Sequence, residues 1–179
     1  MDIKECITTR RSIRSFTDKA VDDEVLKEII FEASHSPSWK NSQSPRYIAV
    51  KDAELKAKIG QCTSAYPHNG EIMAGAPVLV CLTAIKSRAG FERDGSYSTD
   101  RENGWTMFDA GVAAQSFCLA CHEHGLGSVI MGIFDRADIE KVLNLPEDRE
   151  LICLIPIGYP AESPACPKRK TVDELLTIV

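Results

Sequence analysis

The sequence predicts an α/β or α+β fold, in which helices and strands alternate around a central sheet. Two continuous apolar segments, residues 77–84 and 151–157, have the composition of strands that are buried on both faces. Segments with apolar residues at helical spacing lie before and between these strands. The chain has 179 residues. Since one domain typically has about 150 residues, we expect a single domain over residues 1–179.

Further elements follow from capping residues and from the spacing of apolar residues. A first helix begins after Asp2, which suits an N-cap, and a second helix begins near Asp22 and ends before Pro37. The second helix has apolar residues at i, i+3, i+4 and i+7: Leu26, Ile29, Ile30 and Ala33. Shorter helices are predicted over residues 53–61 and 137–143, and short strands over residues 47–50 and 128–131. Residues 86–104 are polar and contain glycine, which predicts a long loop or lid.

Residues 105–124 predict a helix that is apolar on nearly every side and rich in small residues. A helix without a broad polar face is buried, either in a core or against another subunit. Such a helix is roughly 30 Å long, and a chain of this size has little room to surround it. We therefore expect the helix to lie at a subunit interface and to end at Gly125.

Composition and charge exclude several classes of protein. Hydrophobic residues make up 44% and charged residues 26% of the chain, which is ordinary for a globular protein. The formal net charge of −5 does not favour nucleic-acid binding. No apolar segment approaches the roughly 20 residues that cross a bilayer. The opening MDIKEC lacks the apolar region of a secretory signal. We expect a cytoplasmic protein that binds neither nucleic acid nor membrane.

The chain has seven cysteines, an odd number, which favours reduced thiols that pack in the core. Residues 118–122 read C-x-x-C-H, the attachment signature of c-type haem. Together with His124, the same residues also fit a metal site. Core packing is the favoured interpretation of Cys118, Cys121 and His122, because the motif lies within a helix and no second Cys/His pair follows.

Two clusters of basic residues are candidates for binding a phosphate. Arg10, Arg11 and Arg14 surround Ser12, and guanidinium groups with a hydroxyl suit phosphate oxygens. The alternative is a solvated basic surface. The second cluster, residues 168–170, lies near the other end of the chain. The two clusters could converge on one phosphate.

Four segments occur in order over about residues 3–170: R-R-S-I-R-S-F, S-P-S-W-K-N-S-Q, G-L-G-S-V-I-M-G-I-F-D, and P-I-G-Y-P-A-E followed by P-K-R-K. Together they resemble the nitroreductase family of FMN enzymes. The resemblance implies an α+β fold with a central, mostly antiparallel sheet flanked by helices. It also implies an intertwined homodimer that binds FMN at two sites between the subunits. The helix over residues 105–124 is similar to the family's central dimer helix.

The resemblance also assigns FMN contacts to individual residues. Arg10, Arg11 and Ser12 correspond to the residues that bind the phosphate and ribityl chain. Arg14 corresponds to a basic residue near N1 and O2 of the flavin. Pro37, Ser38 and Trp39 correspond to the stretch that the other subunit contributes to the flavin. Asn41 and Gln43 correspond to the polar pair of the N-S-Q motif. The backbone that faces the flavin ring corresponds to Ile130, Met131, Gly132 and Ile133. The phosphate cations of the tail correspond to Lys168 and Lys170, with Arg169 as an alternative.

The resemblance implies that NADH or NADPH reduces a small-molecule acceptor, nitroaromatic or quinone-like, through FMN in a ping-pong cycle. FMN carries the chemistry, so no catalytic acid–base pair is required, and Arg14 tunes the cofactor. The alternatives are an FMN protein with another donor or a regulatory role, and a variant that is similar to a reductive dehalogenase or destroys the flavin. Two departures occur. Ser44-Pro45 replaces a common Pro-Trp, and residues 68–71 lack a common Lys, which leaves open a second cation beside Arg14.

Overall fold

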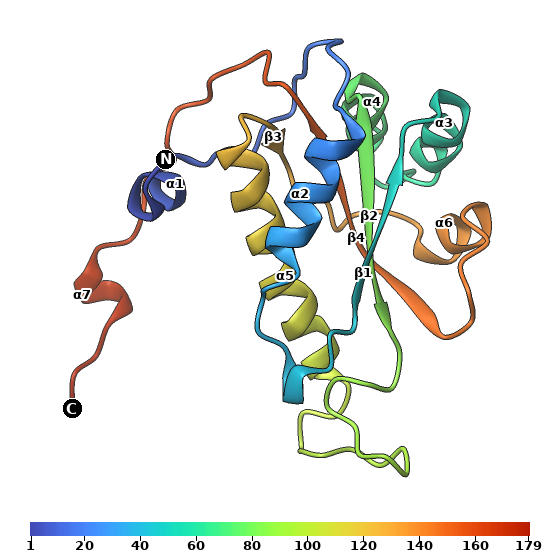
Figure 1. Ribbon diagram of the computed structural model, residues 1–179, viewed down its shortest axis with the longest axis vertical. Coiled ribbons are helices and arrows are strands. Elements are labelled where there is room, and N and C mark those ends of the chain that lie inside the picture. Colours follow the sequence, from blue (N-terminus) through green and yellow to red (C-terminus); the bar gives the residue numbers. More distant parts are fainter.

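A computed structural model describes residues 1–179 and shows an α+β fold around a four-stranded sheet (Figure 1). The strands are β1 (Pro45–Val50), β2 (Val78–Ile85), β3 (Gly127–Ser128) and β4 (Arg149–Gly158). Their order is β1-β2-β4-β3, and every neighbouring pair is antiparallel. The α+β alternative and the antiparallel sheet are therefore confirmed, and the α/β alternative is wrong.

Helices cover both faces of the sheet, as the apolar composition of its central strands predicts. On one face lie α2 (Asp23–Ala33) and α5 (Gly104–Glu123) (Figure 1). On the other face lie α3 (Ala53–Gln61), α4 (His68–Gly75) and α6 (Arg136–Val142). Alternate residues of β2 enter the two cores, with Val80 packed toward α5 and Leu79 toward the opposite layer. This alternation is the reason why β2 is apolar throughout.

Most of the predicted helices begin and end close to the expected residues. The helix α1 (Ile3–Thr9) begins after Asp2, whose carboxylate accepts the backbone N–H of Glu5 at 2.8 Å. Asp52 caps α3 in the same way, because it accepts the N–H of Leu55 at 2.7 Å. Gly125 follows α5 with a φ of 74°, the left-handed conformation that commonly ends a helix. No helix is both long and apolar enough to cross a lipid bilayer.

The strand predicted over residues 128–131 is only partly correct. β3 pairs with β4 at Gly127 and Ser128, and the pairing resumes at Met131, opposite Leu154. The same register places Val129 opposite Pro156. Proline has no N–H to donate, so the ladder is interrupted at that position.

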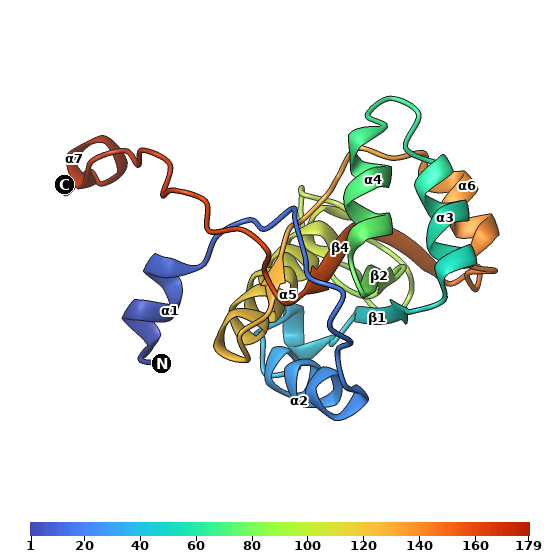
Figure 2. The ribbon, with the colours of Figure 1, turned by 90° about the horizontal axis from the view of Figure 1, so that it is seen from above.

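Two terminal segments lie outside the helical layers that cover the sheet, although α1 contacts the C-terminal half of α5. The helix α1 and the tail after Pro160, which contains α7 (Val172–Leu175), extend to the same side of the molecule (Figures 1 and 2). Both carry exposed apolar side chains: Ile3, Ile7, Val172, Leu175, Leu176, Ile178 and Val179. The predicted loop is confirmed over residues 86–103, which contain no helix or named strand, whereas Gly104 already begins α5.

Candidate functional site

A cavity of about 390 Å³ lies between the end of α1, the C-terminal end of α5 and the beginning of the tail. Arg10 and Arg11 line this cavity, together with His122 and Ser128. Ser12 forms a parallel bridge with Ser128, so its backbone lies beside the same wall. The structure therefore brings together most of the N-terminal residues that the sequence assigned to a phosphate.

The backbone that carries these arginines is held from two sides. The Ile13 N–H donates to the carbonyl of Ser128 at 3.0 Å. A Cβ at Gly127 would lie 2.7 Å from the Cβ of Ile13, so only glycine permits this close approach. On the other side, Glu162 accepts the backbone N–H groups of Arg14 and Ser15. These contacts fix the segment while the side chain of Arg14 remains exposed.

His122 adds a titratable group to the wall of this cavity. Its Nε2 lies 2.8 Å from the hydroxyl oxygen of Thr9. Burial lowers the pKa of His122, and the positive charges of Arg10 and Arg11 act in the same direction. Arg11 is also turned toward α1, because its guanidinium donates to the carbonyls of Thr8 and Arg10 at 2.8 and 2.9 Å. Arg10 makes no such hydrogen bond and is the more available cation.

The segment of residues 130–133 combines one buried residue with three exposed ones. Met131 is buried, and its N–H and carbonyl both pair with Leu154, at 2.8 and 3.1 Å. Ile130 and Ile133 are about half exposed, and a Cβ at Gly132 would meet nothing within 4 Å. The N–H groups of Gly132 and Ile133 donate to no protein group. This segment has room and free donors for a planar ligand.

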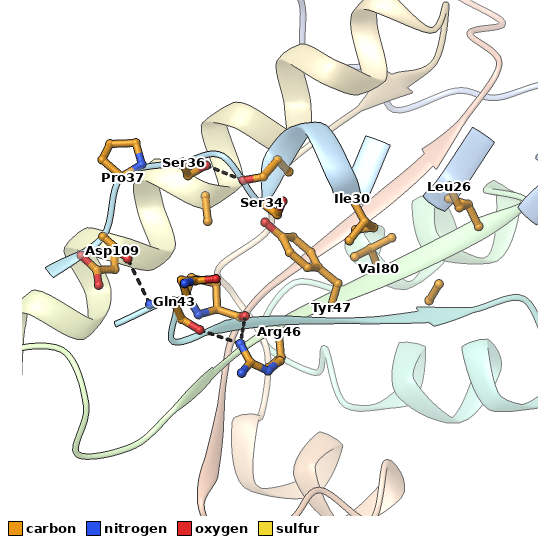
Figure 3. A pocket seen from close by; sticks show the side chains of 15 residues that line it. Leu26, Ile30, Ser34, Ser36, Pro37, Gln43, Arg46, Tyr47, Val80 and Asp109 are labelled. Carbon is orange, nitrogen blue, oxygen red and sulfur yellow. Dashed lines mark hydrogen bonds between the residues drawn. The ribbon is translucent and has the colours of Figure 1, made fainter. Parts of the chain in front are cut away.

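The polar loop over residues 37–43 lies at the other end of α5. Its backbone passes through a short 3-10 helix, Trp39–Asn41, and returns sharply toward β1. Asn41 and Gln43 are exposed. Pro37, Ser38 and Gln43 line a second cavity of about 380 Å³ between α2, β1 and α5, whose walls are mostly apolar (Figure 3).

The two halves of the expected site do not meet within one chain. The first half contacts α5 at His122, and the loop contacts α5 at Asp109 through the backbone of Trp39. These α5 positions are 13 residues apart, a rise of roughly 20 Å along a helix. The basic residues 168–170 are exposed on the tail and line neither cavity.

The cysteines of the C-x-x-C-H motif lie in the core of the chain. Cys118 and Cys121 are buried between α5 and the sheet, and burial raises the pKa of both thiols. Burial also raises the pKa of Cys81 and of Cys153 to about 12. No group of three or more His, Cys, Asp or Glu side chains is arranged to hold a metal ion. The thiols remain protonated at neutral pH and pack as small apolar groups.

Sequence reasoning missed three residues of this region. Glu162 belongs to the quoted P-A-E segment but received no role. His122 was considered only with the cysteines. Asp109 had a clear signal, because it is the only charged side chain between Gly104 and the end of the C-x-x-C-H motif. An acidic residue in an otherwise apolar helix requires hydrogen-bonding partners, which the loop of residues 37–43 provides.

Comparisons with known proteins agree with this arrangement. The sequence profile of the nitroreductase family matches residues 7–66 and 61–159. A protein of Methanothermobacter thermautotrophicus, provisionally named NADH dehydrogenase/NAD(P)H nitroreductase, is 32% identical over 171 residues, which cover 92% of this chain and 80% of that protein. An iodotyrosine deiodinase of Haliscomenobacter hydrossis is 26% identical over 192 residues, which cover 95% of this chain and 84% of that protein.

Two solved structures are similar over almost their whole length. A nitroreductase family protein from Streptococcus pneumoniae has a TM-score of 0.87 at 25% identity, over 99% of this chain and 100% of that chain. A protein from Desulfovibrio desulfuricans, solved in complex with FMN, has a TM-score of 0.82 at 27% identity, over 100% of this chain and 97% of that chain. Profile, relatives and fold agree, and the chain belongs to the nitroreductase family.

Proposed function

We propose that this protein is an FMN-dependent oxidoreductase that uses NADH or NADPH to reduce nitroaromatic or quinone-like acceptors in a ping-pong cycle. The observation that carries the proposal is the basic cavity beside Arg10 and Arg11. The similar protein from D. desulfuricans, which was solved in complex with FMN, supports the choice of cofactor. The name of the M. thermautotrophicus relative supports a reduced nicotinamide as the donor.

The residues present fit FMN. Arg10, Arg11 and the hydroxyl of Ser12 would bind the phosphate, because guanidinium groups and hydroxyls match its oxygens in charge and geometry. The free N–H groups of Gly132 and Ile133 would hold the ring edge beside an open surface. When bound, FMN supplies the hydride chemistry, and the protein binds and orients it. The positive charge of Arg14 would favour the anionic reduced cofactor.

The proposed active form is an intertwined homodimer. The two halves of the site contact α5 far apart along its length, which supports a second chain that supplies Pro37, Ser38, Trp39, Asn41 and Gln43 to the cavity of the first. Exposed apolar side chains support this assembly. Met107 and Phe108 of α5 are 57% and 60% exposed, and α1 and the tail also present apolar residues. The basic residues 168–170 lie on that tail, and they would reach a phosphate only after the tail packs against the dimer.

A second candidate is reductive removal of a halogen from a phenolic substrate. The similarity to an iodotyrosine deiodinase favours it. So does the aromatic cluster next to the loop of residues 86–104, where Trp39 packs on Trp105 at 4.5 Å and Trp105 on Phe108 at 5.3 Å. Aromatic side chains offer stacking surfaces to any flat acceptor, so the acceptor must be decided by experiment.

The deciding experiment is an anaerobic titration of the purified, FMN-loaded protein with NADH and NADPH. We expect the flavin absorbance to decrease within seconds and to return when a nitroaromatic or a quinone is added. The same reduced protein is then offered an iodinated phenol, and release of iodide would favour the second candidate. If neither nicotinamide lowers the absorbance within minutes, the proposed donor is wrong. An FMN protein with another donor or a regulatory role then becomes the better account.

A further inference from the structure

The loop that we assign to the partner's cofactor has an unusual backbone. Lys40, Asn41 and Gln43 have φ angles of 45°, 54° and 47°, although none of them is glycine. Side chains with a Cβ rarely adopt this left-handed region, and a cluster of such residues is strained. Such a strained backbone conformation persists only where contacts with the surrounding structure stabilise it by more than the strain costs.

The main contact comes from Asp109, which is only 2% exposed. Both of its carboxylate oxygens accept the backbone N–H of Trp39 at 3.0 Å, and Oδ2 also accepts the hydroxyl of Ser42 at 3.0 Å. Asp109 takes part in none of the ion pairs of the structure. A buried carboxylate is costly unless hydrogen bonds compensate it, and here every one of them comes from the loop. Asp109 lies at the same end of the cavity as Pro37 and Gln43 (Figure 3).

Other contacts close the loop on itself and join it to neighbouring segments. Lys40 pairs with Glu92 at 2.8 Å, and the guanidinium of Arg46 donates to the carbonyl of Gln43 at 2.6 Å. The N–H of Gln43 donates to the hydroxyl oxygen of Ser38 at 3.0 Å. The ring of Trp39 packs on Trp105, whose Nε1 donates to Thr99 at 3.0 Å. Asp109 therefore holds the residues on either side of Lys40 and Asn41.

We propose that Asp109 is a positioning residue that holds residues 38–43 in the strained conformation and so presents Asn41 and Gln43 to the cofactor of the partner subunit. This inference rests on the proposed FMN site. In this proposal, α5 packs in the core and also, through Asp109, determines the conformation of the binding loop. Asp109 itself is buried behind the loop and does not touch the cofactor.

The test compares Asp109→Asn with Glu140→Gln. Glu140 also accepts a backbone N–H, that of Leu151 at 2.8 Å, but it lies on α6. We expect Asp109→Asn to raise the Kd for FMN about tenfold or more, the scale of a lost hydrogen bond to a charged group. The near-ultraviolet circular dichroism of the Trp39–Trp105 pair should change as well. In Glu140→Gln, the Kd for FMN and the near-ultraviolet circular dichroism should both match those of the wild type. Ser42→Ala, which removes one donor, should give a smaller effect and serves if Asp109→Asn does not fold.

A rescue experiment separates positioning from simple loss of stability. Lys40→Gly relieves the left-handed strain at that position, because glycine adopts positive φ freely. It also removes the ion pair of Lys40 with Glu92 at 2.8 Å, so Lys40→Ala, which removes the ion pair and keeps the Cβ, is its control. In the Asp109→Asn background, Lys40→Gly should recover part of the FMN affinity relative to Lys40→Ala, since the loop then needs less support. Wild-type affinity and an unchanged tryptophan spectrum in Asp109→Asn would overturn the inference, as would the absence of any rescue. If the wild type binds no FMN, the proposed function fails, and the tryptophan spectra of the FMN-free proteins still decide the role of Asp109.

Discussion

Nε2 of His122 lies 2.8 Å from the hydroxyl oxygen of Thr9, so that the end of α1 and the end of α5 are joined beside Arg10. This contact sets the wall of the basic cavity and places an imidazole among cations. It links the stability of the N-terminal segment to pH and to the charge of any ligand in the cavity.

The first prediction concerns pH. The pKa of His122 is lowered mainly by burial, so the folded chain holds this proton less tightly than the unfolded chain does. The stabilising effect is fully present above the unfolded value of about 6.5 and is lost as pH falls toward the lowered value. The midpoint of thermal unfolding should fall between roughly pH 7.5 and 5.5, a range that spans the unfolded pKa of about 6.5. This fall should be smaller in His122→Gln than in the wild type. His35→Gln, at an exposed position in the turn after α2, is the control and should follow the wild type. An equal fall in all three proteins would contradict this role of His122.

The second prediction concerns the phosphate. Arg10→Ala should weaken FMN binding by about 1.5–3 kcal/mol, the range for a hydrogen bond to a charged group. Riboflavin lacks the phosphate, so its affinity should be nearly unchanged. Fluorescence titration with both ligands measures the difference, and Arg136→Ala on α6 is the matched control. Equal weakening of both ligands would show that Arg10 does not bind the phosphate.

The third prediction concerns assembly. Gly111 lies on the exposed side of α5 near Met107 and Phe108, and an added Cβ meets nothing within 4 Å in a single chain. Light scattering of the wild type should give about twice 19.7 kDa. Gly111→Glu should shift the protein to the single-chain mass, because a charge would be buried in the interface. In a chain that does not dimerise, the same change should add roughly 0.5–1 kcal/mol of helix stability. Lys58→Glu on α3 should leave the mass unchanged.

The fourth prediction concerns the C-x-x-C-H motif. Cys118→Ala and Cys121→Ala should each lower the free energy of unfolding by roughly 0.5–3 kcal/mol, since they remove buried atoms from the core. Their FMN content and turnover should remain those of the wild type. Denaturant unfolding, absorbance and elemental analysis provide the three measurements. Loss of cofactor or of a stoichiometric metal in either variant would replace the packing interpretation with a ligand role.

The elements that the sequence predicted well have local signals. Asp2 and Asp52 cap α1 and α3, and β2 and β4 are apolar because both of their faces are buried. The helix α4 had no such signal, because its sequence, HNGEIMAG, contains two glycines and no amphipathic repeat. It is stabilised by tertiary contacts, with Ile72 and Met73 packed into the core.

The candidate site was only partly readable for a different reason. The cluster around Arg10 is local in the sequence, and its residues remain together in the fold. The anchoring of Trp39 by Asp109 joins positions 70 residues apart, which no local pattern indicates. Likewise, the separation of the loop from the basic cavity depends on the direction of α5. The family resemblance placed the stretch around Trp39 in the other subunit, but no local pattern in the sequence shows that a single chain holds the two groups apart.

The placement of these two groups at opposite ends of α5 has a genetic consequence. In the proposed homodimer, Arg10→Ala would damage the cavity half of a site and Asp109→Asn the loop half, so each variant homodimer would have two impaired sites. In a mixed dimer, one site would combine both defects and the other would have neither. Two weakly binding variants that are refolded together should therefore complement each other and regain one intact site in every mixed pair.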